Sequence, residues 1–153
     1  MEAGYKRLEI YKLAHALAVQ IHKMSLTLPK HELYEQGSQI RRSSKSVTGQ
    51  IVEGFALRKY KAEYLHYLYR SYGSCEETVE HLAYLMETGS LDDRTKGSEL
   101  SEGYNKLSRM LFRFIQSVEQ SHDTPSFLKD SAAEYSTLAS GNENPEPTIQ
   151  NLL

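Results

Sequence analysis

The sequence contains no tryptophan, a single cysteine and only four prolines in 153 residues. Because Cys75 is the only cysteine, no disulfide can form within the chain. No apolar run approaches the roughly 20 residues of a membrane-spanning helix, and the N-terminus has no apolar segment typical of a signal peptide. These absences predict a cytoplasmic protein with no membrane partner.

The charge is unevenly distributed, although the net charge is only -2. Basic residues outnumber acidic ones in residues 1–60, whereas acidic residues are in excess over residues 61–153. Two explanations fit this polarity: the two halves attract each other within or between subunits, or the first half binds an anionic partner. We favour the first, because mixed charged surfaces are common in folded proteins.

Apolar residues recur at three- and four-residue steps, which is typical of amphipathic helices. The spacing predicts helices over about residues 5–28, 32–58, 61–87 and 91–120. The links between them are short, which favours antiparallel neighbours. We therefore expect an all-α fold, an antiparallel up-and-down four-helix bundle over residues 1–121. Residues 122–153 are polar and rich in helix breakers, and predict an irregular, partly ordered C-terminal tail.

The core-facing row of the second predicted helix, here called its seam, is made mostly of small residues: Leu33, Gly37, Ile40, Ser44, Val47, Ile51 and Gly54. Glycine inside a helix costs about 1 kcal/mol relative to alanine. We therefore expect Gly37, Gly49 and Gly54 to let neighbouring helices approach closely.

The third predicted helix has the strongest periodicity, with a heptad seam of Leu65, Leu68, Tyr72, Cys75, Val79, Leu82 and Met86. Gly89 then predicts a left-handed helix stop, and Ser90 is the expected N-cap of the fourth helix. Gly97 and Gly103 are expected to weaken the first half of that helix.

No catalytic or metal-binding pattern is complete. Glu63 and His66 give one Glu-x-x-His spacing, but a di-iron bundle needs two. Cys75 lies on a seam, where a thiol is usually a small buried hydrophobe. The sequence thus predicts no enzyme, no metal, no cofactor and no small-molecule substrate.

Tyrosines and basic residues are the candidate binding residues. Tyr60, Tyr64 and Tyr67 share a helix face outside the Leu68–Cys75 seam, and we interpret that face as a subunit interface. The alternative is that tyrosines stack on single-stranded nucleic acid beside a basic surface. The basic residues proposed for that role are Arg41, Arg42, Lys45, Arg58 and Lys59. Arg41 and Arg42 also admit a structural role, opposite carboxylates such as those of Glu76, Glu77 and Glu80.

Several segments resemble a known family. They are residues 8–15 (LEIYKLAH), 28–32 (LPKHE), 38–42 (SQIRR), 51–55 (IVEGF) and 63–77. Together they resemble the bacterial four-helix-bundle proteins encoded by intervening sequences of 23S rRNA genes, also labelled S23 ribosomal proteins. Accessory variability determinants of diversity-generating retroelements belong to the same group. The resemblance covers about residues 5–120, but Thr48 and Gln50 replace the proline and asparagine that are usual in the family.

The resemblance implies an antiparallel four-helix bundle that assembles as a ring, with a pentamer as the expected size. For retroelement members it also implies binding of a reverse transcriptase and of RNA or DNA. We therefore predict a non-enzymatic, oligomerising helical scaffold, with a nucleic-acid-binding accessory protein as the alternative. The chain's slightly acidic net charge argues against the alternative, because phosphate binding depends on a basic surface.

Overall fold

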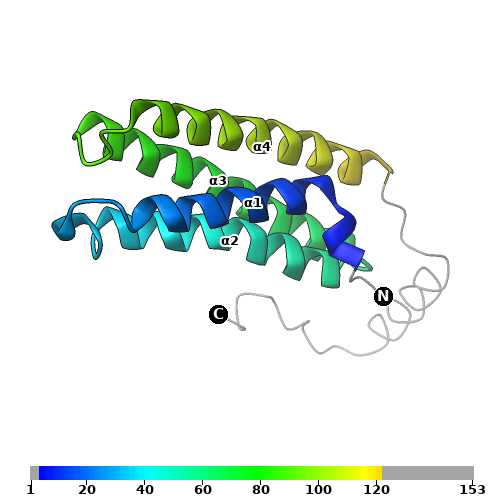
Figure 1. The fold of residues 1–153 in the computed structure, drawn as a ribbon. Coiled ribbons are helices and arrows are strands. Elements are labelled where there is room, and N and C mark those ends of the chain that lie inside the picture. The colour runs from blue at the N-terminus through cyan, green and yellow to red at the C-terminus, as the bar shows by residue number, and fades with distance from the viewer. Residues whose placement is uncertain (1–3, 122–153) are drawn as a thin grey trace, which may run out of the picture. The chain divides into compact units, whose positions relative to one another are not determined.

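A computed structural model of the chain describes residues 4–121, which form an all-α bundle (Figure 1). Two short 3-10 helices and four α-helices follow in order: η1 (Gly4–Arg7), α1 (Glu9–Ser25), η2 (Lys30–Glu32), α2 (Gln36–Ala56), α3 (Lys61–Glu87) and α4 (Arg94–Ser121). Consecutive α-helices run in opposite directions, and the described residues contain no β-strand. The predicted four-helix bundle is confirmed. The predicted tail, residues 122–153, lies outside the described residues.

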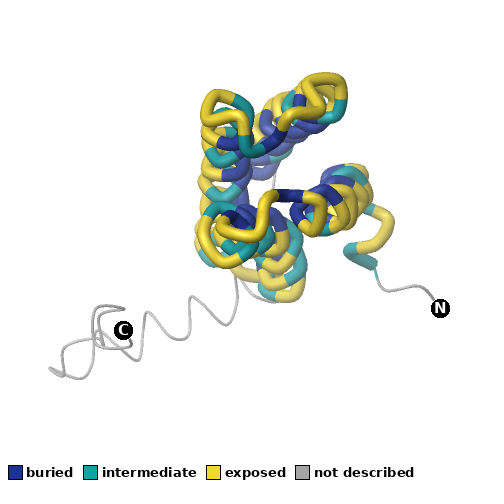
Figure 2. The backbone as a smooth tube through the Cα atoms, turned by 60° about the vertical axis from the view of Figure 1, so that its left-hand side comes forward, coloured by how far each residue is buried: buried dark blue, intermediate teal, exposed yellow. Residues whose placement is uncertain are grey.

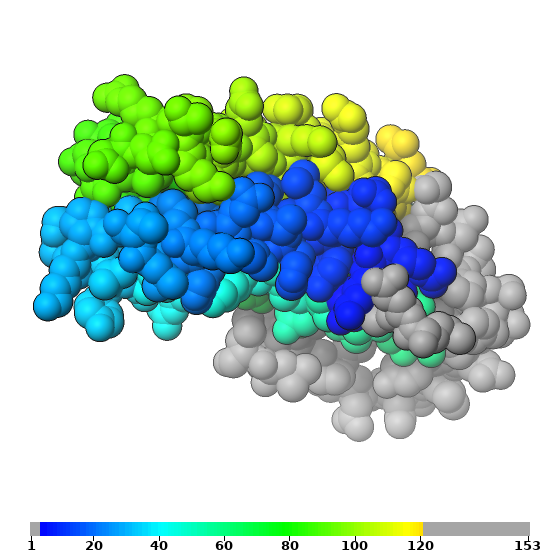
Figure 3. Space-filling view, in the orientation of Figure 1, coloured from blue at the N-terminus to red at the C-terminus, as the bar shows by residue number. Residues whose placement is uncertain are grey.

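Each α-helix packs against two others. α1 and α3 both contact α2 and α4, so α1 is diagonal to α3, and α2 to α4. On the face shown in Figure 3, α1 lies between α4 and α2. Buried residues line the inner sides of the helices (Figure 2). The core is therefore a single column of side chains enclosed by the four helices.

Small side chains on α2 and α3 make room for a large one from α4. Ser44 on α2 and Cys75 on α3 are fully buried, as is the whole of Tyr104 on α4. Burial raises the pKa of the Tyr104 hydroxyl, although the neighbouring Ser44 hydroxyl acts in the opposite direction. The tyrosine ring thus fills volume that larger residues on α2 and α3 would occupy, which keeps the interior close-packed.

Buried hydroxyl groups link α2 to α3. The Ser71 hydroxyl donates to the Val47 carbonyl oxygen at 2.8 Å, and the Thr78 hydroxyl to the Ser43 hydroxyl oxygen, also at 2.8 Å. Pairing matters here, because an unsatisfied buried polar group costs about 1–3 kcal/mol. Side chains as small as these also allow the two helices to lie close together.

Only one of the three predicted close-approach glycines lies against a neighbouring helix: a Cβ atom on Gly54 would lie 3.1 Å from the Tyr67 Cβ atom of α3. A Cβ atom on Gly37 would instead lie 2.6 Å from the Glu32 carbonyl oxygen, in the turn directly before α2, so its contact is local to the chain. The expected close approach is also wrong for Gly49, which is exposed and has no such neighbouring atom within 4 Å.

The glycines of α4 do not weaken it. Gly97 lies against Met86 of α3, and a Cβ atom on Gly103 would be 2.5 Å from the Leu17 Cδ2 atom of α1. The helix is continuous through both positions. Close helix contact therefore accounts for these two residues, and the expected weakening is wrong.

The helix ends differ from the prediction by several residues. The first predicted helix is divided into η1 and α1, and α2 begins at Gln36, after η2 and a turn. Gly89 has the predicted left-handed conformation, with φ 78°. Ser90 does not cap α4, because its hydroxyl donates to Glu32 Oε1 at 2.8 Å. The Asp93 carboxylate caps α4 instead, accepting a hydrogen bond from the Lys96 backbone N–H at 3.0 Å.

The seam of α3 is rotated from the predicted one. Its buried residues are Tyr64, Leu68, Ser71, Cys75, Thr78, Leu82 and Leu85. Leu68, Cys75 and Leu82 were predicted correctly, whereas Leu65, Tyr72, Val79 and Met86 are only partly buried. α3 packs against both α2 and α4, and these two contacts set its rotation about its own axis. A heptad pattern alone indicates one apolar side and does not specify this rotation.

Candidate functional site

Metal-ligating side chains do not cluster within residues 4–121, and Cys75 is buried. No three His, Cys, Asp or Glu side chains in this range are close enough to hold a metal ion. The Cys75 thiol is fully buried and donates a weak hydrogen bond to the Tyr104 carbonyl oxygen at 3.5 Å. Burial, with a smaller contribution from Glu76, raises the pKa of Cys75 to about 12. A thiol with this pKa stays protonated near neutral pH and is a poor nucleophile.

The predicted tyrosine face does not exist as one surface. Tyr64 is only 4% exposed and packs in the core, with its ring centroid 6.1 Å from that of Phe114. Burial raises the pKa of Tyr64 to about 12, against the opposing charge of Arg58. The prediction that Tyr64 is available to another subunit is therefore wrong. Tyr60 is 54% exposed, and Tyr67 is half-buried beside Gly54.

The predicted basic surface is divided by local contacts. The Arg41 guanidinium donates to the Leu33 carbonyl oxygen at 2.7 Å and to the Ser25 hydroxyl at 2.9 Å, so Arg41 ties the α1–α2 link to both helices. This is a structural role, but its partners are not the predicted carboxylates of Glu76, Glu77 or Glu80.

The other four basic residues are exposed but not equivalent. Arg58 lies 4.0 Å above the centroid of the Phe55 ring and donates to the Phe55 carbonyl oxygen. Lys59 follows it in the α2–α3 link, whereas Arg42 and Lys45 lie on the outer side of α2. The structure therefore separates the predicted set into the α2–α3 link and the α2 surface.

Lys45 lies at a groove between α1 and α2. The groove has a volume of about 380 Å³ and is lined by His15, Ala18, Val19, His22, Lys23, Lys45 and Thr48. No acidic side chain lines it, and Lys23 and Lys45 are both exposed. The arrangement suits an anionic group. No single stretch of sequence indicates this groove, because its lining residues come from two helices.

An aromatic surface absent from the prediction lies between α3 and α4. Phe112 is 47% exposed, and its ring centroid lies 6.2 Å from that of Tyr72. Tyr69, 48% exposed, donates a 2.6 Å hydrogen bond to the Glu119 carboxylate, which raises the tyrosine pKa. We call Tyr69, Tyr72 and Phe112 the aromatic strip. Phe112 lies outside the row of buried residues on α4. An aromatic residue at such a position was the indication of this surface that the sequence contained.

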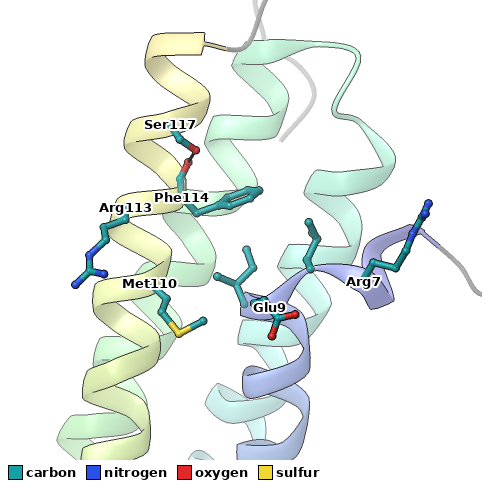
Figure 4. A pocket seen from close by; sticks show the side chains of 8 residues that line it. Arg7, Glu9, Met110, Arg113, Phe114 and Ser117 are labelled. Carbon is teal, nitrogen blue, oxygen red and sulfur yellow. Dashed lines mark hydrogen bonds between the residues drawn. The ribbon is translucent and has the colours of Figure 1, made fainter.

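A second groove opens where α1 begins and α4 ends (Figure 4). Its volume is about 480 Å³, and it is lined by Arg7, Leu8, Glu9, Ile10, Met110, Arg113, Phe114 and Ser117. η1 turns toward α2, where Gly4 lies against Phe55, and so leaves the last turns of α4 uncovered by α1. Arg7 and Arg113 lie on opposite sides of this groove in Figure 4.

Taken together, these features define a four-helix bundle whose candidate sites are surfaces for binding. Within residues 4–121, no helix combines the length and apolarity that a bilayer span requires. Residues 6–113 match the family model described as 23S rRNA-intervening sequence protein. The chain belongs to the 23S rRNA-intervening sequence protein family.

A solved structure has the same fold. It is a protein with unknown function from the S23 ribosomal protein family of Bacteroides thetaiotaomicron VPI-5482. The two chains are 19% identical, with a TM-score of 0.64, over 70% of this chain and 95% of the other. No curated protein matches this chain.

Proposed function

We propose that this chain is a non-enzymatic scaffold of the bacterial cytoplasm that self-associates through exposed aromatic side chains. The aromatic strip carries the proposal. Its outer members, Tyr69 and Phe112, are about half exposed although both are large and apolar. Fully burying one such side chain is worth about 1.5–3 kcal/mol, and aromatic residues are enriched in protein interfaces.

The rest of the molecule supports a scaffold role. Burial raises the pKa of the Cys75 thiol to about 12, which is too high for a nucleophile at neutral pH. A lone reduced thiol also agrees with a cytoplasmic location. The family resemblance favours a ring, with five copies as the expected size, and Tyr60 and Tyr67 remain candidate contact residues at the α2–α3 end.

Light scattering on the full chain at tens of micromolar tests self-association. A mass that is a multiple of the 17.5 kDa chain supports the proposal, and a monomer at that concentration overturns it. Phe112→Ser combined with Tyr69→Ser should lower the mass. Tyr34→Ser is the matched control, because Tyr34 is 85% exposed and lies far along the chain from the strip, between η2 and α2.

A second candidate function is nucleic-acid binding, and the α1–α2 groove favours it. Lys45 and Lys23, with His15 and His22, place only neutral or cationic groups along the groove. Binding of lysines to phosphates releases counterions from the nucleic acid. This release becomes less favourable as salt is added, so the binding weakens. Arg42, Arg58 and Lys59 would extend the contact. Through the family resemblance, the protein partner in this case is a reverse transcriptase.

Titration with single- and double-stranded RNA at low salt tests this candidate. Lys45→Glu should weaken binding and reduce its salt dependence. Arg70→Glu, at an exposed position of α3, is the matched control for the same charge change. If both changes weaken binding equally, the groove is not the binding site. If the wild-type chain binds no RNA, this candidate function is wrong.

A further inference from the structure

Neighbouring helices α3 and α4 carry opposite charge. α3 has five acidic and two basic side chains, whereas α4 has five basic and three acidic ones. On the exposed surface of α3, Glu76, Glu80 and Glu87 form what we call the acidic stripe. On α4, the exposed Lys106, Arg109 and Arg113 form the basic stripe. Steps of three, four and seven residues place each set along one side of its helix.

Within residues 4–121, no ion pair joins the acidic stripe to the basic stripe. Lys12 pairs with Glu9, and the His31 and His81 rings lie beside Glu32 and Glu77; none of these contacts links the two stripes. Glu76 accepts a hydrogen bond from Ser108, which is a neutral donor. Apart from the Ser108 hydrogen bond to Glu76, the charged groups of both stripes are therefore exposed at the surface and available to a partner.

The aromatic strip adjoins both stripes: Tyr69 lies seven residues before Glu76 on the same side of α3, and Phe112 lies three residues after Arg109 on α4. Tyr69 and Tyr72 come from α3 and Phe112 from α4, and the Tyr72 and Phe112 rings meet across the helix pair. An apolar centre bordered by charged residues is the usual organisation of a protein interface. Both signs of charge are present on this one surface, so a partner must itself offer both signs.

We infer that the acidic stripe of one copy docks against the basic stripe of the next copy, with the aromatic strip beside the contact. This inference rests on the proposed self-association and names the surface and the orientation. A second copy meets the requirement because it presents both stripes. A nucleic acid does not, since the acidic stripe would repel its phosphates.

Charge reversal on each helix tests the inference by light scattering and analytical ultracentrifugation. Glu80→Lys with Glu87→Lys places like charges opposite the basic stripe, and Arg109→Glu with Arg113→Glu does the same opposite the acidic stripe. Each pair should weaken association about tenfold or more, because like charges facing each other in an interface are strongly unfavourable. The fourfold variant that carries both pairs restores opposite charges and should associate again.

The outcomes separate the inference from the proposed function. If the wild-type chain is a monomer, self-association itself is wrong, and the inference fails with it. If the wild-type chain associates and neither pair weakens it, or the fourfold variant fails to recover while keeping the wild-type helical content, only the inference is overturned. Charge reversal at Lys12, whose side chain pairs with Glu9 on α1, is the control and should leave the mass unchanged.

Discussion

The hydroxyl oxygens of Ser43 on α2 and Thr78 on α3 lie 2.8 Å apart in the buried interface between these helices. Each hydroxyl also has an acceptor in its own helix, the Ile40 carbonyl oxygen for Ser43 and the Ser74 carbonyl oxygen for Thr78. Both residues are almost inaccessible to water. The contact fixes the position of α3 against α2 without any bulky side chain between them.

Thr78→Val should destabilise the bundle by about 1–3 kcal/mol, because it removes the buried hydrogen bond between α2 and α3. Urea denaturation followed by circular dichroism measures the change. Thr48→Val is the matched control: the Thr48 hydroxyl bonds only to a carbonyl of its own helix, at Lys45. Equal stability losses in the two variants would contradict the importance assigned to the α2–α3 contact.

Alanine at two glycines of α2 should have opposite effects. Gly49→Ala should stabilise the protein by up to about 1 kcal/mol, since an exposed helical glycine is replaced with no neighbour to displace. Gly37→Ala should destabilise it by about 1–3 kcal/mol, because the added Cβ would meet the Glu32 carbonyl oxygen, which belongs to the backbone. Thermal unfolding of both variants provides the test. A Gly37→Ala protein as stable as the Gly49→Ala protein would rule out the close contact.

Two adjacent arginines should differ in their effect on stability. Arg41→Ala removes hydrogen bonds to the Leu33 carbonyl and the Ser25 hydroxyl and should cost about 1–3 kcal/mol. Arg42→Ala, at an exposed position, should change stability by less than about 0.5 kcal/mol. Chemical denaturation of the two single variants compares them directly. A larger loss for Arg42→Ala would show that the two arginines have been assigned the wrong roles.

Stability should fall at high pH because of buried acidic groups. Burial raises the pKa of Cys75 from 9.0 to about 12 and that of Tyr64 from 10.0 to about 12. As pH rises, the unfolded chain therefore loses these protons at lower pH than the folded chain does. The stabilisation from the two protonated groups is complete below about pH 9 and is lost as pH rises toward 12. Denaturation at a series of pH values should show this decline, and Cys75→Ala should reduce its slope. A constant stability up to pH 11 would contradict the burial of both groups.

Periodicity alone was enough to predict the four helices and their order, because each helix has one long apolar side. It could not place α3 correctly around its own axis. The positions that face α2 are held by Ser71 and Thr78, small polar residues whose hydroxyls bond to α2 once the helices meet. A pattern of apolar residues selects Leu65 and Tyr72 in their place.

The candidate surfaces were harder to predict, since they combine residues from different helices. Arg41 appeared to belong with Arg42, but its partners are a backbone carbonyl and a hydroxyl that no spacing rule indicates. Tyr64 appeared exposed because it is one turn from Tyr60, whereas the α2–α3 corner buries it beside Gly54. The basic stripe of α4 was visible as a three- and four-residue repeat in a part of the chain counted as acidic overall.

The cyclic order of the helices has a consequence for the rate of folding. The α1–α2, α2–α3 and α3–α4 interfaces join segments adjacent in the sequence, and only α1–α4 joins distant ones. Chains dominated by such local contacts fold within microseconds to milliseconds, because little loop entropy is lost before each contact forms. The two helical hairpins can thus assemble early, and closure of α1 onto α4 becomes the step that depends on the whole polypeptide.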